Sequence, residues 1–159
     1  MTSFASWLAQ GPWPIDGGLS GELEKRGHNL ADKLWSARLL RDAPEAIAQV
    51  HQDYVDAGGR VIITASYQAS RTGFVATGMT EEQADDLMRL SITLAKEVAA
   101  TAEEKVWVAA SVGPYGAVLG GGQEYVGNYG VAHEDLVKFH RERIEVLTSA
   151  KPDLFACET

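Results

Sequence analysis

Short apolar runs alternate along the chain with longer segments of helical periodicity. Four runs are predicted to form strands, at residues 13–15, 60–64, 106–112 and 153–157. Three of these runs are continuously apolar and do not alternate with polar residues. Such runs are typical of parallel strands that are covered on both faces of their sheet.

The segment between the first two of these runs has the spacing of an amphipathic helix. Ile47, Val50 and Tyr54 recur every three or four residues, which places them on one helix face. Asp42 and Glu45 stand three residues apart before this stripe, as the two partners of a capping box do. The pattern predicts a helix that begins near Asp42.

Two further segments have the same helical period. Thr80 and Gln83 are spaced as a second capping box, and an apolar stripe follows them over residues 84–98. The third predicted helix carries an apolar face made of Leu136, Phe139, Ile144 and Leu147.

The resulting order of strand and helix predicts an α/β fold with a parallel sheet, as in a barrel or a doubly wound sheet. No Gly-x-Gly-x-x-Gly motif follows a strand, so a dinucleotide-binding fold has no support. Polar residues follow every predicted strand, where (β/α)8 barrels build their active sites. A whole barrel takes about 250 residues. We therefore expect residues 1–159 to be the first half of a (β/α)8 barrel domain, truncated after four parallel strands.

Charge and composition exclude some classes of function. The chain has 22 acidic and 14 basic residues and a net charge of -8, which argues against a nucleic-acid partner because phosphates require a basic surface. Glycines and a proline interrupt the longest uncharged stretch, at residues 106–123, so no membrane span is expected. Cys157 is the single cysteine, which we expect to be a small buried residue. Nothing indicates an oxidising compartment, and a cytoplasmic location is expected.

Six short motifs in register resemble those of the homocysteine S-methyltransferases. They occupy residues 16–27, 34–40, 50–59, 64–70, 111–117 and 156–159. Two of the motifs resemble the branch that uses S-methylmethionine or S-adenosylmethionine more than the betaine or cobalamin branches. Their sequences are Thr-Ala-Ser-Tyr-Gln-Ala-Ser and Ser-Val-Gly-Pro-Tyr-Gly. The resemblance covers nearly the whole chain, and it implies a (β/α)8 barrel, in agreement with the periodicity.

The resemblance also implies a reaction and a set of site residues. The reaction is transfer of a methyl group from a sulfonium donor to homocysteine, which gives methionine. Asp16 and Glu158 match the family's two acidic residues that hold the ammonium group of homocysteine. Gly17 matches a glycine that lets the backbone approach the substrate. Tyr67 matches a tyrosine beside the metal, and it is the candidate catalytic residue.

Zinc is the cofactor that the resemblance implies. A free thiol has a pKa near 8.5, and zinc binding deprotonates it. In the family the zinc ligands are three cysteines on strands of the second half of the barrel. Cys157 lies outside those motifs, so we expect no metal ligand among these residues.

Each assignment has a structural alternative. Asp16-Gly17 is also a common turn dipeptide, Glu158 could be a frayed terminal residue, and Tyr67 could be a packing aromatic at the rim. The chain could be a non-catalytic half-barrel or another barrel enzyme. A half-barrel exposes strand edges, so we expect it either to self-associate, for example as a homodimer, or to remain partly molten.

Overall fold

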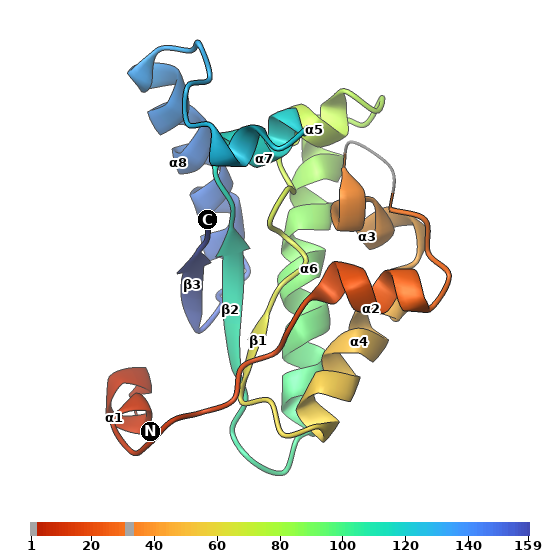
Figure 1. Ribbon diagram of the computed structural model, residues 1–159, viewed down its shortest axis with the longest axis vertical. Coiled ribbons are helices and arrows are strands. Elements are labelled where there is room, and N and C mark those ends of the chain that lie inside the picture. Colours follow the sequence, from red (N-terminus) through yellow and green to blue (C-terminus); the bar gives the residue numbers. More distant parts are fainter. Residues whose placement is uncertain (1–2, 31–33) are drawn as a thin grey trace.

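The computed structural model describes residues 3–30 and 34–159, in which helices pack around a small parallel sheet (Figure 1). Its elements, in chain order, are α1 (Phe4–Leu8), α2 (Leu19–Lys25), η1 (Trp35–Arg38), α3 (Leu39–Asp42), α4 (Pro44–Asp56), β1 (Val61–Ile63), α5 (Arg71–Val75), α6 (Glu81–Thr101), β2 (Trp107–Val112), α7 (Tyr115–Leu119), η2 (Gln123–Tyr125), α8 (His133–Ser149) and β3 (Leu154–Cys157).

Within residues 3–30 and 34–159, the sheet has three parallel strands in the order β1-β2-β3. Val61 pairs with Trp107, and Ala109 pairs with Leu154. The parallel α/β arrangement that the sequence predicted is therefore confirmed. Because all three strands run in one direction, their carboxyl ends lie at the same edge of the sheet.

The prediction of a fourth strand at residues 13–15 is wrong for the described chain. Ile15 forms only an isolated parallel bridge with Val61. The Pro14 carbonyl accepts a hydrogen bond from the Arg60 amide at 2.8 Å, but Pro14 has no amide hydrogen with which to extend a ladder. The segment follows β1 far enough to bring Asp16 to the carboxyl end of that strand.

Helices cover one face of the sheet. Ile47 and Val50 of α4 are fully buried, as the helical spacing predicted, and they pack with Val108 and Ala110 of β2. The long helix α6 runs beside α4, and α8 packs against α6 (Figure 1). All six residues of β2 are buried, so the expectation of coverage on both faces holds for this central strand.

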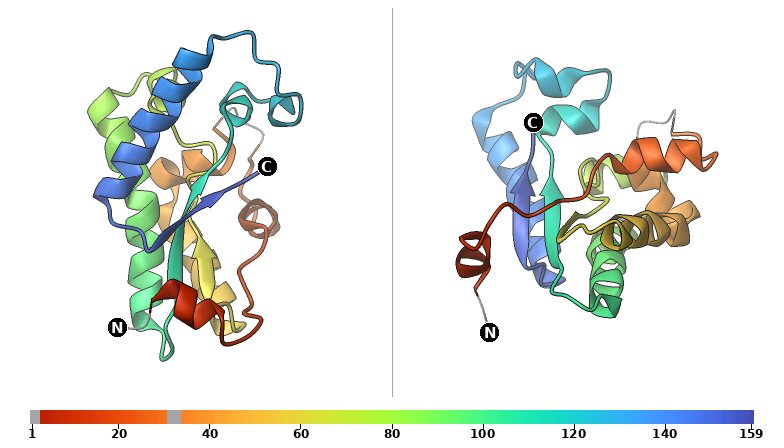
Figure 2. Two further views of the ribbon diagram at one scale, coloured as in Figure 1. Left: turned by 90° about the vertical axis from the view of Figure 1, so that its left-hand side faces the viewer. Right: turned by 60° about the horizontal axis from the view of Figure 1, so that its bottom comes forward.

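An aromatic cluster covers the other face near the amino-terminal ends of the strands. Trp7 of α1 stacks on Trp13 with ring centroids 4.6 Å apart. Phe4 meets Trp107, the first residue of β2, edge to face at 5.2 Å. Figure 2 shows α1 beside the lower ends of the strands, apart from α4 and α6.

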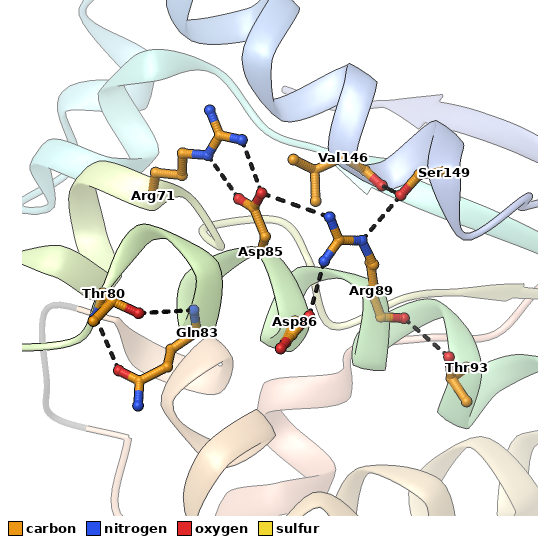
Figure 3. A network of polar contacts seen from close by, with 9 residues as sticks. All are labelled: Arg71, Thr80, Gln83, Asp85, Asp86, Arg89, Thr93, Val146 and Ser149. Atoms are coloured by element: carbon orange, nitrogen blue, oxygen red, sulfur yellow. Dashed lines mark hydrogen bonds and ion pairs between the residues drawn. The ribbon is translucent and has the colours of Figure 1, made fainter.

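The two predicted capping boxes have different outcomes. Thr80 and Gln83 form theirs at the start of α6 (Figure 3), where the Thr80 hydroxyl accepts from the Gln83 amide at 3.2 Å. The prediction of a capping box formed by Asp42 and Glu45 is wrong, because no side chain caps the start of α4. Helix α4 begins at Pro44 after the N-cap residue Ala43, because proline suits the first turn of a helix. Asp42 instead ends α3.

The buried face of α8 differs from the predicted stripe. Leu147 is fully buried, whereas Ile144 is 38% exposed. The charged residue Arg143 lies on the buried face, with 2% of its surface exposed. The helix is therefore rotated so that a guanidinium group, and not the isoleucine, points inward.

The expectation that Cys157 is buried is wrong. Cys157 is exposed, because it lies on the same face of the edge strand β3 as Phe155, and this is the more exposed face of that strand. Phe155 is itself 38% exposed. As for membranes, none of the helices in the described ranges has the length and apolar character that crossing a bilayer requires.

Candidate functional site

A pocket of about 200 Å³ opens at the carboxyl ends of the strands. Its walls come from the segment after residue 16, from the loop that follows β1, and from the ends of β2 and β3. The lining residues are Gly17, Gly18, Leu19, Ser20, Ser36, Ile63, Thr64, Ala65, Tyr67, Gln68, Ser111 and Glu158. The pocket thus brings together three of the four site residues predicted from the sequence.

Asp16, the fourth, lies at the base of this region against β1. Its carboxylate accepts a hydrogen bond from the Ile63 amide at 2.7 Å, and its own amide donates to the Val61 carbonyl at 3.0 Å. Burial, together with a smaller contribution from the negative charge of Glu158, raises the pKa of Asp16 from 3.8 to about 7. The two carboxylates are therefore close enough to repel each other.

Glu158 is fixed at the end of β3 by main-chain and side-chain bonds. Its amide donates to the Val112 carbonyl at 3.1 Å, and its carboxylate accepts a hydrogen bond from the Ser111 hydroxyl. Glu158 is thus bonded to β2 through both its main chain and its side chain. The Ser111 contact leaves one carboxylate oxygen of Glu158 for another partner.

Hydroxyl groups connect the ends of β1 and β2 below this carboxylate. The Thr64 hydroxyl lies 2.7 Å from the Ser66 hydroxyl and accepts from the Ser111 amide at 3.1 Å. The Ser66 hydroxyl donates to the Ser111 carbonyl at 2.8 Å. Polar residues were predicted from the sequence at both strand ends, but no role was predicted for Ser111. Its position directly before the end of a strand was the available signal.

Tyr67 lies on the loop between β1 and α5 and borders the pocket. Its phenol hydroxyl is 2.5 Å from the Thr159 hydroxyl. Burial raises the pKa of Tyr67, so the phenol is protonated at neutral pH and can act as a hydrogen-bond donor. The structure therefore places Tyr67 at the same pocket as Glu158.

Gly17 has a packing reason to be glycine. A Cβ atom at this position would lie 2.9 Å from the Tyr54 hydroxyl of α4, whereas at Gly18 it would meet nothing within 4 Å. A side chain at Gly17 would therefore push this segment away from α4. The absence of a Cβ lets the chain that follows Asp16 pass close to α4 on its way along the pocket.

The loop that carries Tyr67 is anchored on its far side by an ion-pair network (Figure 3). Arg71, at the start of α5, forms two hydrogen bonds with the mostly buried Asp85 of α6, at 2.7 and 2.8 Å. Arg89, one turn further along α6, donates to the Ser149 hydroxyl of α8 at 3.1 Å. Two parallel bonds between a guanidinium and a carboxylate fix geometry well. The network therefore holds α5, α6 and α8 together behind the loop.

The implied zinc does not fit the residues present. Among the described residues, no group of three or more histidine, cysteine, aspartate or glutamate side chains could hold a metal ion. Structural and catalytic zinc sites use at least three protein ligands. The pocket combines carboxylates, hydroxyls and backbone groups, which suit a cationic amine better than a soft metal ion.

Comparison with known proteins defines the class of this fold and site. The family model for homocysteine S-methyltransferase matches residues 15–159. The chain therefore belongs to the homocysteine S-methyltransferase family.

Individual relatives agree with this assignment. The chain is 49% identical over 151 residues to homocysteine S-methyltransferase of Escherichia coli (strain K12), with 91% of this chain and 49% of that protein covered. It is 44% identical over 158 residues to homocysteine S-methyltransferase YbgG of Bacillus subtilis (strain 168), again with 91% and 49% covered. The chain spans about half the length of the curated relatives it matches.

A solved structure supports the fold. The metallated form of the homocysteine methyltransferase MmuM from Escherichia coli superposes with a TM-score of 0.88 at 45% identity. The match covers 96% of this chain and 56% of that one. The helices and parallel strands of this chain thus correspond to the N-terminal part of a barrel methyltransferase, with three strands in the described sheet.

Proposed function

We propose that this chain supplies the homocysteine-binding part of a homocysteine S-methyltransferase, as the N-terminal half of its barrel domain. One observation carries the proposal: Glu158 lines the pocket, and Asp16, far from it in the sequence, lies near enough for the two charges to interact. Family membership makes homocysteine the substrate to test first.

The pair of carboxylates would bind the ammonium group of the substrate. An amine that leaves water needs new acceptors, and charge-assisted bonds to carboxylates are the strongest available. The ammonium would also relieve the repulsion that raises the pKa of Asp16. The free oxygen of Glu158 and the Asp16 carboxylate would face the amine, and Tyr67 would lie toward the reacting end of the substrate.

The proposed reaction is a methyl transfer between two sulfur atoms. The homocysteine thiol loses its proton to solvent, and the thiolate attacks the methyl carbon of a sulfonium donor. A new carbon–sulfur bond forms as the bond from the methyl group to the donor sulfur breaks, and the electron pair of the broken bond stays on the donor sulfur. A thiolate and a sulfonium cation thus give two neutral thioethers: methionine from homocysteine, and the demethylated donor.

We propose S-methylmethionine or S-adenosylmethionine as the donor, because the motifs at residues 64–70 and 111–117 are closest to that branch. We place the zinc ligands of the complete enzyme outside these 159 residues, since the described part of the chain offers no cluster for them. This chain's share of the work is then to bind and orient homocysteine.

Titration calorimetry with homocysteine tests the clamp. We expect the variants Asp16→Ala and Glu158→Gln each to raise the dissociation constant at least tenfold, because each removes a charge-assisted bond. The matched control is Glu82→Gln, which removes an exposed carboxylate at the start of α6 and should leave the affinity unchanged. Unchanged affinity in the Asp16 and Glu158 variants would refute the clamp.

A second candidate is a non-catalytic half-barrel that binds but does not turn over. It is favoured by the lack of a metal cluster among the described residues and by coverage of about half of each relative. An assay of methyl transfer with added zinc distinguishes the two, because turnover by this chain alone excludes the half-barrel. We also propose that such a half-barrel self-associates through β3, whose Phe155 is partly exposed. Light scattering that shows a monomer would contradict this.

A further inference from the structure

Arg143 is a buried cation that neither the sequence motifs nor the family comparison assigns. It lies on α8 with 2% of its surface exposed. Its Nη1 donates to the Gly113 carbonyl at 2.9 Å, and its Nη2 donates to the carbonyls of Ser66 and Tyr67. The guanidinium thus binds main-chain oxygens on the loop after β1 and on the loop after β2.

Burying the charged guanidinium of Arg143 costs free energy, and an apolar side chain would fill the same space without that cost. In the described ranges, no carboxylate lies within salt-bridge distance of Arg143, and its Nε has no hydrogen-bond partner. Burial lowers the pKa of Arg143 to about 10. Apolar residues of similar volume often replace buried charges without loss of stability. A role in geometry explains the charge better than a role in stability.

The two loops that Arg143 joins are in direct contact beside the pocket. A Cβ atom on Gly113 would lie 2.6 Å from the Tyr67 carbonyl oxygen and 2.7 Å from Cδ2 of the Tyr67 ring. Gly113 also follows Ser111, whose hydroxyl holds Glu158, by two residues. A small change in the spacing of the loops would therefore move the Tyr67 ring relative to the carboxylate.

We propose that Arg143 is a positioning residue whose forked guanidinium sets the distance between these two loops, so that Tyr67 and Glu158 face one pocket. A planar guanidinium presents several donors in a fixed fork, whereas a lysine ammonium is a single point that cannot hold both loops in the same way. The effect on the loops stands on the contacts themselves, and the effect on homocysteine rests on the proposed function.

The test compares Arg143→Met and Arg143→Lys in the full chain with Arg141→Met, which changes an exposed arginine on the same helix. Tyrosines labelled with carbon-13 at Cζ give one NMR signal each for five residues, and Tyr67→Phe identifies the signal of Tyr67. We expect this signal to shift in both Arg143 variants while that of Tyr54 on α4 stays in place. Calorimetry should show the homocysteine dissociation constant rising at least tenfold in Arg143→Met and less in Arg143→Lys.

A structural role alone would lower the melting temperature without moving the Tyr67 signal of the folded protein. Either folded Arg143 variant with the wild-type Tyr67 signal and wild-type affinity overturns the proposal, as does an equal effect of Arg141→Met. If Arg143→Met does not fold, Arg143→Lys, which keeps the charge, decides the question. If the wild-type chain does not bind homocysteine, the proposed function fails, whereas the shift of the Tyr67 signal still tests the role of Arg143.

Discussion

Replacing Asp16 by asparagine should make the protein more stable at alkaline pH while it weakens ligand binding. Asparagine has nearly the same shape, and its carbonyl oxygen can still accept the hydrogen bond of the Ile63 amide. The substitution removes only the negative charge, which burial and Glu158 oppose in the folded state.

The magnitude follows from the pKa of Asp16, which folding raises from 3.8 to about 7. Below pH 3.8 the carboxyl is neutral in both the folded and the unfolded chain. As the pH rises toward 7, the unfolded chain ionises first, so the wild type loses stability over this window and no further above it. At about 1.4 kcal/mol per pH unit, the wild type loses at most about 4 kcal/mol of unfolding free energy through Asp16. Water near the partly exposed carboxyl screens its charge and reduces this loss to about 2 kcal/mol.

Urea unfolding followed by circular dichroism at pH 5, 6, 7 and 8 measures the effect. The free energy of unfolding of Asp16→Asn should exceed that of the wild type by an amount that grows with pH and levels off above pH 7. The exposed variant Glu82→Gln serves as the control and should show no such trend. A difference between Asp16→Asn and wild type that is constant with pH would refute the reasoning.

Three further predictions concern other positions. His51 is buried, and neither of its ring nitrogens has a hydrogen-bond partner among residues 3–30 and 34–159. Burial lowers its pKa from 6.5 to about 4, so the unfolded chain takes up the proton first as the pH falls. Urea unfolding should show the stability of the wild type relative to His51→Leu falling by about 3 kcal/mol between pH 6.5 and 4, because both proteins share the opposite contribution of Asp16. Ser111→Ala frees the Glu158 carboxylate and should weaken homocysteine binding by calorimetry about tenfold, since bonds to charged groups contribute about 1.5 kcal/mol; no change would mean that Ser111 does not orient Glu158. Gly113→Ala places a methyl group against Tyr67 and should lower the unfolding free energy by about 1–3 kcal/mol, and an unaltered urea midpoint would contradict the close loop contact.

The fold could be predicted where short-range patterns decide the structure. Continuous apolar runs indicated all three strands of the described sheet, and Thr80 with Gln83 marked the start of α6. Where proline intervenes, the patterns misled, because Pro14 prevents a strand and Pro44 sets the start of α4. Both effects come from the missing amide hydrogen and the fixed φ of proline, which an apolar pattern does not register.

The site could be predicted only in part. Parallel strands bring their carboxyl ends together, so the meeting of Tyr67 and Glu158 at one edge follows from topology. Arg143 could not be found this way, because an arginine on a helix is normally assigned to the solvent face. The available signal was that Arg143 stands four residues after Phe139 and three before Val146, on the helix face that these residues share. The role of Arg143, however, depends on main-chain carbonyls that only the folded loops bring near.

The aromatic cluster of Trp7, Trp13 and Trp107 has a practical consequence for optical work on this protein. Trp107 begins β2 and Ser111 lies four residues further along the strand, a span of about 13 Å at the usual rise per residue. These three of the chain's four tryptophans lie at the end of the molecule opposite the pocket, whereas the fourth, Trp35, directly precedes the pocket residue Ser36. Only the part of the indole emission that comes from the cluster therefore reports whether the base of the sheet is assembled, and a small ligand seated near Ser111 is too distant to quench that part by contact.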